Sequence, residues 1–188
     1  MLWIAPPRQL GRSVADWIMR YKLLSIAVLI FGLSFVSAQI PKNRNAALRT
    51  FKACIRPTRP ATLDCSQEFV ANVIAFYNRG DYSLLRPLLD AGPSSDGALS
   101  EELGDFYSKV LLKNPRRFLA SVRLRPVKQQ QQLCWMAGAV DGSGMEPQML
   151  FSVRHSLRVI SSRRTDSLSS SARICLTNVN RANASNGR

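Results

Sequence analysis

The chain has 188 residues and is strongly basic, with 26 lysine and arginine residues against 12 acidic residues and a formal net charge of +14 at pH 7. A field of this sign raises the local concentration of anionic partners such as lipid head groups, acidic glycans, nucleic acid or acidic proteins. The chain has a single histidine and no CxxC spacing, a composition that argues against the usual zinc sites. We therefore expect no metal and no cofactor.

An apolar stretch near the start of the chain predicts export. The sixteen residues 23–38 carry no charge and follow Arg20 and Lys22. As a helix they would span roughly 24 Å at ~1.5 Å per residue, which is less than the ~30 Å hydrocarbon core of a bilayer. This length favours a signal peptide, and the small residues before Gln39 predict cleavage after Ala38.

The leader before this stretch is longer than a signal peptide requires, so we expect translation to begin at Met19. The alternative is that residues 23–38 remain as an uncleaved membrane anchor. In both interpretations residues 39–188 leave the cytosol. The protein is therefore expected to be secreted or periplasmic, or else anchored in the membrane through its N-terminal segment.

After residues 1–38, the chain divides into three parts by composition. Residues 39–61 contain three prolines and no acidic residue, and are expected to be an extended basic lead-in. Residues 62–181 show helical periodicity and are predicted to form a single domain. Residues 182–188 are expected to be a disordered tail.

The first half of the domain predicts two helices. Apolar residues recur at helical spacing from Phe69 to Tyr77, with Thr62 or Asp64 as a cap. Gly80 can end this helix, and Asp81 can cap a short leucine-rich helix that Pro87 kinks or shortens.

The second half predicts five more helices. The clearest covers residues 97–113, and Asn114-Pro115 ends it and starts another. The others are expected after Pro126, across residues 150–160, and after Thr165 or Asp166. Strand signals are almost absent. The predicted fold class is therefore all-α, an irregular bundle or short array of antiparallel helix pairs with about seven helices after the N-terminal segment.

Four cysteines follow the predicted cleavage site, where an oxidising compartment lets disulfides persist. We favour pairing of Cys54 with Cys65, and of Cys134 with Cys175. In a reducing compartment the same residues would be small apolar core positions.

Two acidic residues are the candidates for catalysis. Glu101 and Asp105 lie four residues apart on one helical face, as paired carboxylates of a glycan-acting hydrolase would. The structural alternative is that they complement the helix dipole and that Asp105 pairs with Lys109. The only histidine, His155, is expected to be exposed because it points away from its helix's apolar face.

The late part of the chain is rich in arginine. Residues 39–60 carry a net charge of +6, residues 61–110 carry −5 and residues 111–188 carry +10. If the late helices pack together, their guanidinium groups could converge and hold a phosphate or carboxylate bidentately. Otherwise they form a dispersed solubilising surface. The candidate binding residues are Arg116, Arg117, Arg123, Arg125, Arg154, Arg158, Arg163 and Arg164.

Together these patterns predict an exported, non-catalytic binding protein that contacts an anionic envelope component or an acidic protein through its basic C-terminal half. Nucleic acid is not an expected partner of an exported protein, and the membrane is expected to be met only through the N-terminal segment. One alternative is the hydrolase with Glu101 and Asp105. A helical adaptor that grips a peptide in an apolar groove is a further possibility. Asn183-Ala184-Ser185 is a glycosylation sequon, with meaning only in a eukaryotic secretory pathway.

Overall fold

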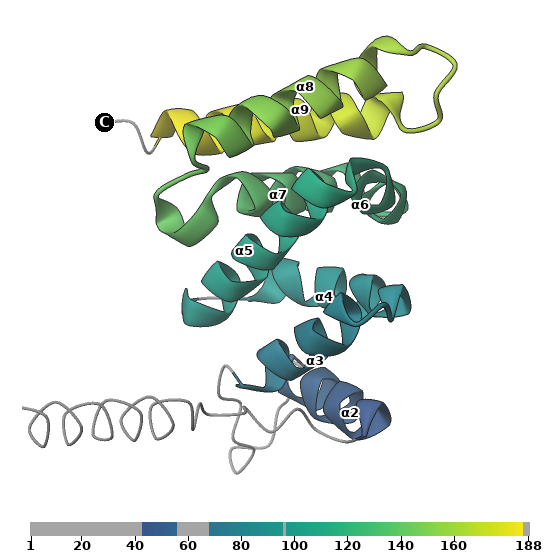
Figure 1. The fold of residues 1–188 in the computed structure, drawn as a ribbon, viewed down its shortest axis with the longest axis vertical. Helices are drawn as coiled ribbons and strands as arrows, with labels where there is room; N and C mark the ends of the chain where they lie inside the picture. Colours follow the sequence, from purple (N-terminus) through teal and green to yellow (C-terminus); the bar gives the residue numbers. More distant parts are fainter. Residues whose placement is uncertain (1–42, 56–67, 96, 186–188) are drawn as a thin grey trace, which may run out of the picture. The chain divides into compact units, whose positions relative to one another are not determined.

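The computed structural model describes residues 43–55, 68–95 and 97–185. The described residues form eight α-helices and three short 3-10 helices, and they contain no strand (Figure 1). The predicted all-α class is confirmed. The predicted signal or anchor segment lies outside the described residues. None of the helices within the described part is long and apolar enough to cross a bilayer.

The first helix, α2 (Arg44–Cys54), corrects one expectation. Residues 39–61 were expected to be extended, yet residues 44–54 are helical. The Asn43 side chain caps the helix by accepting hydrogen bonds from the backbone N–H groups of Asn45 and Ala46. Ala47, Phe51 and Cys54 lie at i, i+4 and i+7 and are buried, so an apolar face runs through the basic sequence.

The next elements lead into the candidate site. Helix α3 (Glu68–Asn78) ends before Gly80, which has the positive φ of 106° that glycine tolerates. A 3-10 turn, η1 (Tyr82–Leu84), leads into the short helix α4 (Leu85–Ala91) and a second turn, η2 (Gly92–Ser94). The predicted helix break after Asn78 is thereby confirmed.

The later helices follow the predicted boundaries closely. Helix α5 covers Gly97–Lys113, and Asn114 caps α6 (Pro115–Val122) by accepting a hydrogen bond from the Arg117 backbone at 3.1 Å. The remaining elements are α7 (Val127–Gly138), η3 (Val140–Gly142), α8 (Pro147–Ser162) and α9 (Ser169–Ser185). The expectation of a disordered tail from residue 182 is wrong for residues 182–185, because α9 continues through them and buries Ala182.

Helices that are neighbours in the sequence pack on one another. Contacts join α2 to α3, α5 to α6, and α8 to α9. Helix α7 lies against both α5 and α9, and Figure 1 shows α8 and α9 side by side. This order places α3, α5 and the start of α6 around one groove.

The C-terminal helices are held by a covalent link and close backbone packing. Cys134 on α7 and Cys175 on α9 form a disulfide with 4.8 Å between their Cα atoms, which confirms that predicted pair. A Cβ atom on Gly138 would come within 2.9 Å of the Val179 Cα atom, so glycine permits the close approach of α7 and α9. Cys54 is also disulfide-bonded, and its predicted partner Cys65 lies outside the described residues.

Candidate functional site

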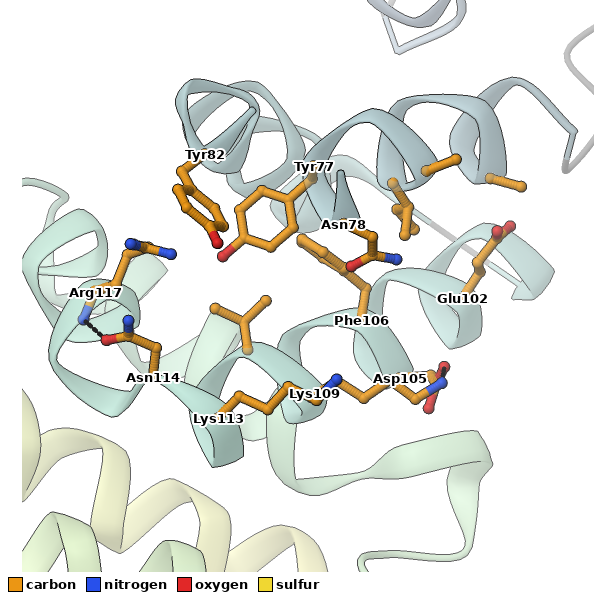
Figure 2. Close-up of a pocket in the computed structure, with 14 residues that line it drawn as sticks. Tyr77, Asn78, Tyr82, Glu102, Asp105, Phe106, Lys109, Lys113, Asn114 and Arg117 are labelled. Carbon is orange, nitrogen blue, oxygen red and sulfur yellow. Dashed lines mark hydrogen bonds and ion pairs between the residues drawn. The ribbon is translucent and has the colours of Figure 1, made fainter. Parts of the chain in front are cut away.

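A groove of about 610 Å³ lies between α3 and α5 and reaches the start of α6. Helix α3 lines it with the small residues Ala71 and Ala75, four positions apart on one helical face. Phe106 and Val110 line it from α5. Because alanine leaves room that a larger side chain would fill, an open groove remains between these helices, and the Phe106 ring lies in it (Figure 2).

Three aromatic rings form one wall of the groove. Tyr77 meets Phe106 edge to face, with 5.0 Å between ring centroids, and meets Tyr82 in the same manner at 5.4 Å. Edge-to-face geometry is the favourable arrangement of aromatic pairs. Tyr77 and Phe106 are buried, which holds this part of the wall in place, whereas Tyr82 is half exposed.

Arg117 lies at this aromatic end. Its Cζ atom is 3.6 Å from the centroid of the Tyr82 ring, a close cation–π contact. Figure 2 shows the Tyr77 and Tyr82 hydroxyl groups pointing toward the guanidinium group. Hydrogen bonding to the Tyr77 hydroxyl, and to a lesser extent to Tyr82, raises the pKa of Arg117. The guanidinium group is therefore held by uncharged partners, and among the described residues it forms no ion pair.

The other end of the groove is acidic. Glu102 and Asp105 line it there, and burial, followed by the neighbouring Asp105 charge, raises the pKa of Glu102. Lys109 forms an ion pair with Asp105 over 2.5 Å, and the exposed side chain of Lys113 extends in the direction of Lys109 (Figure 2). The groove thus has Arg117 at its aromatic end and two carboxylates at the other, one of which is paired with Lys109.

The predicted catalytic pair lies in an adjoining recess. Glu101 and Asp105 both line this second space of about 630 Å³, which is open to solvent, and Glu101 is exposed. The ion pair of Asp105 with Lys109 confirms the structural alternative for Asp105. Within the described residues, no three histidine, cysteine or acidic side chains are grouped to hold a metal ion.

Two of the eight candidate arginines act on the same carboxylate. Arg116 on α6 forms an ion pair with Asp166 over 2.8 Å, and the charge of Arg163 also acts on Asp166. The hydrogen bond from the Leu168 backbone is the largest cause of the lowered pKa of Asp166, followed by the bond from Arg116. This contact joins the start of α6 to the turn before α9.

The other candidate arginines have different surroundings. Arg125 pairs with Asp90 over 2.8 Å, and Arg154 donates from Nε to the Asn180 Oδ1 atom over 2.6 Å. Arg117 lies in the groove, away from both. The remaining side chains are exposed: Arg123, Arg158, Arg163 and Arg164.

Sequence reasoning missed the two tyrosines of the groove. Tyr77 was expected only as a core contact, and Tyr82 carried no prediction. The available signal was their position on either side of the helix break, since residues that flank a break can face a shared cavity. His155 is exposed as predicted, and its ring stacks on Phe151 with 6.5 Å between centroids.

Comparison of the chain with models of protein families, with curated proteins and with solved structures finds no match in any of the three. The case for a function therefore rests on the geometry of the groove and on its charges.

Proposed function

We propose that this chain is an exported, non-catalytic interaction protein, and that the groove between α3 and α5 binds an acidic segment of a partner protein. The observation that carries the proposal is the state of Arg117. Its guanidinium group lines the groove and stacks on the Tyr82 ring, with no carboxylate partner among the described residues.

The contrast with two other arginines supports this interpretation. Arg116 and Arg125 each have an aspartate at 2.8 Å, so their charges are already matched. Stacking on Tyr82 covers one face of the Arg117 guanidinium group. Its five N–H donors outnumber the two tyrosine hydroxyl groups that it meets, so donors remain for a ligand. A carboxylate that met these donors would form the strong, charge-assisted kind of hydrogen bond, with two donors available from one planar group.

The rest of the groove suits a peptide segment. The exposed side chain of Lys113 adds a second positive charge to the lining of the groove. Phe106 and Val110 offer apolar surface next to it. The ligand class is therefore a segment that carries an acidic residue beside an apolar or aromatic one.

The charge of the chain supports association with such a partner. Residues 111–188 carry a net charge of +10, and long-range attraction of this kind raises association rates more than it raises final affinity. We expect binding to weaken with salt, since exposed charges are screened over about 8 Å at physiological ionic strength.

We also propose that the protein is exported from the cytosol and that its helices form antiparallel pairs. The Cys134–Cys175 disulfide supports an oxidising compartment, where such bonds persist. Consecutive helices that pack on one another, such as α8 and α9, support a short array of antiparallel pairs. The signal peptide over residues 1–38 remains a prediction.

The decisive test compares matched peptides on matched variants. The probes are a fluorescent peptide that alternates glutamate with leucine and the same peptide with glutamine in place of glutamate, read by fluorescence anisotropy. We expect the glutamate peptide to bind more tightly, and Arg117→Gln to weaken it by about tenfold to a hundredfold, the usual loss for a charged hydrogen bond. The control is Arg123→Gln, which removes an exposed arginine that does not line the groove.

Two results would contradict the proposal. Equal affinity for the glutamate and glutamine peptides would show that the carboxylate does not contribute to binding. Equal losses in Arg117→Gln and Arg123→Gln would indicate attraction by net charge alone.

The hydrolase alternative has a separate test. Release of reducing sugar from an envelope glycan that stops in both Glu101→Gln and Asp105→Asn would favour it over the binding role. A two-carboxylate mechanism requires both groups to take part in the reaction, whereas Asp105 is paired with Lys109 in this structure.

A further inference from the structure

Helix α8 exposes a stripe of apolar and aromatic side chains. Phe151 is 72% exposed, the largest fraction among the large hydrophobic residues of the described part, and Val159 is 39% exposed. Phe151, His155 and Val159 lie at i, i+4 and i+8 and therefore share one face of the helix. The stacked rings of Phe151 and His155 make the first part of this stripe one continuous surface.

The core of the protein does not use this stripe. Helix α8 packs on α9, and its buried residues are Val153, Leu157 and Ile160. These occupy the opposite side of the helix from Phe151 and His155. The exposed stripe is therefore a surface that folding has left uncovered within the described residues.

The charged residues of α8 itself are all positive. Helix α8 contains two arginines and no acidic residue, and Arg163 and Arg164 follow its last turn. Arg154 is hydrogen-bonded to the uncharged side chain of Asn180, so its charge remains unmatched by that contact. Arg158 is exposed close to the stripe, because it follows His155 by three residues.

We propose that the exposed face of α8 docks onto an anionic lipid surface. Phe151 and Val159 would enter the interfacial layer, and the arginines of α8 and of the turn after it would contact the phosphates of the head groups. Helices with apolar residues on one outward face and basic residues beside them lie in the membrane interface in this way. This site is separate from the peptide groove of α3, α5 and α6.

A lipid surface fits this face better than a protein partner does. The stripe lies on the outward, convex side of a single helix, so that a partner must be flat or deformable to cover it. A bilayer interface meets this condition, and the absence of acidic residues on α8 suits a surface of one charge sign. Aromatic and aliphatic side chains gain from partial burial there, while arginine keeps its head group in contact with phosphate.

The test uses the full chain with a tryptophan placed on α8, because a local reporter separates docking of α8 from any insertion of residues 23–38. The variant Phe151→Trp is mixed with vesicles of phosphatidylcholine, or of phosphatidylcholine with an equal amount of phosphatidylglycerol, that contain brominated lipid. The spectrum of the unmodified chain is subtracted. The control is Val127→Trp, at a position of α7 that is also exposed, at 56%.

We expect the added fluorescence of Phe151→Trp to shift to the blue and to be quenched on phosphatidylglycerol vesicles, and that of Val127→Trp to stay unchanged. The double variant Phe151→Trp with Arg158→Gln should bind phosphatidylglycerol vesicles about fivefold more weakly than Phe151→Trp alone, because it has one basic residue fewer near the anionic surface. Neither position is buried, so circular dichroism should show unchanged helix content.

Three results would overturn the proposal. The added fluorescence of Phe151→Trp could stay unquenched, both reporters could be quenched equally, or phosphatidylcholine alone could give the full effect. A blue shift caused by soluble polyglutamate but not by phosphatidylglycerol vesicles would assign the face to an acidic protein instead.

Discussion

Asn183 on α9 donates a hydrogen bond from Nδ2 to the carbonyl oxygen of Gly138, the last residue of α7, over 3.0 Å. Its Oδ1 atom accepts a bond from the Met145 backbone over 2.8 Å. One side chain thus fixes both ends of the connection between α7 and α8. A glycan on this sequon asparagine would have to replace its contact with Gly138.

We expect Asn183→Ala to lower the free energy of unfolding by about 1–3 kcal/mol, because it leaves part-buried backbone groups without partners. The measurement is urea unfolding followed by circular dichroism. Thr177→Ala, at an exposed position of the same helix, is the matched control and should change stability little. Equal effects of the two substitutions would show that the Asn183 bonds do not stabilise the fold.

Removal of the disulfide should have a larger effect. Cys134 and Cys175 are 41 residues apart, and a cross-link over such a loop stabilises by about 4 kcal/mol in the chain-entropy model. The double variant Cys134→Ala with Cys175→Ala should therefore unfold at much lower urea concentration. Addition of a reductant should shift the unmodified protein more than the double variant, in which only the disulfide of Cys54 remains to be reduced. An unchanged midpoint in the variant would contradict this account.

The buried hydroxyl group of Tyr107 provides a third test. It donates to the Leu88 carbonyl oxygen over 2.6 Å, and burial raises the pKa of Tyr107. Tyr107→Phe should cost about 1–2 kcal/mol, since it leaves a buried carbonyl without this donor. Tyr82→Phe removes a hydroxyl from a residue that is 50% exposed and should have a smaller effect on thermal unfolding. The reverse order would refute the role of the Tyr107 bond.

Asp166 should make stability depend on pH in the acidic range. The bonds from the Leu168 backbone and from Arg116 lower the pKa of Asp166 below its ordinary value of 3.8. A carboxylate with a lowered pKa in the folded state stabilises the protein above its unfolded pKa. This contribution is lost as the pH falls through the folded pKa.

We therefore expect Asp166→Asn to unfold more easily than the unmodified protein at neutral pH, with the difference shrinking toward pH ~2, below both pKa values. Urea midpoints measured across this range would check it. Arg116→Gln should reproduce part of the effect, because Arg116 is the second cause of the shift. A difference that stays constant with pH would assign the effect to packing rather than to charge.

Local patterns in the sequence predicted the helices but not the groove. The boundary at Asn114 depends on a cap and a proline that are adjacent in the chain, and the structure confirms it. Helix α2 was missed because its short apolar face is interspersed with basic residues and lies between prolines. The groove brings Tyr77 and Arg117 together from positions 40 residues apart, as the helices that carry them pack. The spacing of apolar residues along the chain does not show which helices pack against each other.

The same limit applies to the charged residues. The pair of Asp105 with Lys109 follows from i, i+4 spacing and could be predicted. The bonds of Arg44 to Asp81 and of Arg116 to Asp166 join distant segments, so the sequence alone could not show that these arginines have partners.

The link between Cys134 and Cys175 has a consequence for cleavage of this protein by a protease. A cut in the connection over residues 141–147 would fall inside the covalent ring, and the two pieces would remain attached as one molecule. On a denaturing gel the nick would become visible only after a thiol is added. A clipped chain would thus keep α8 and α9 joined to the rest of the protein.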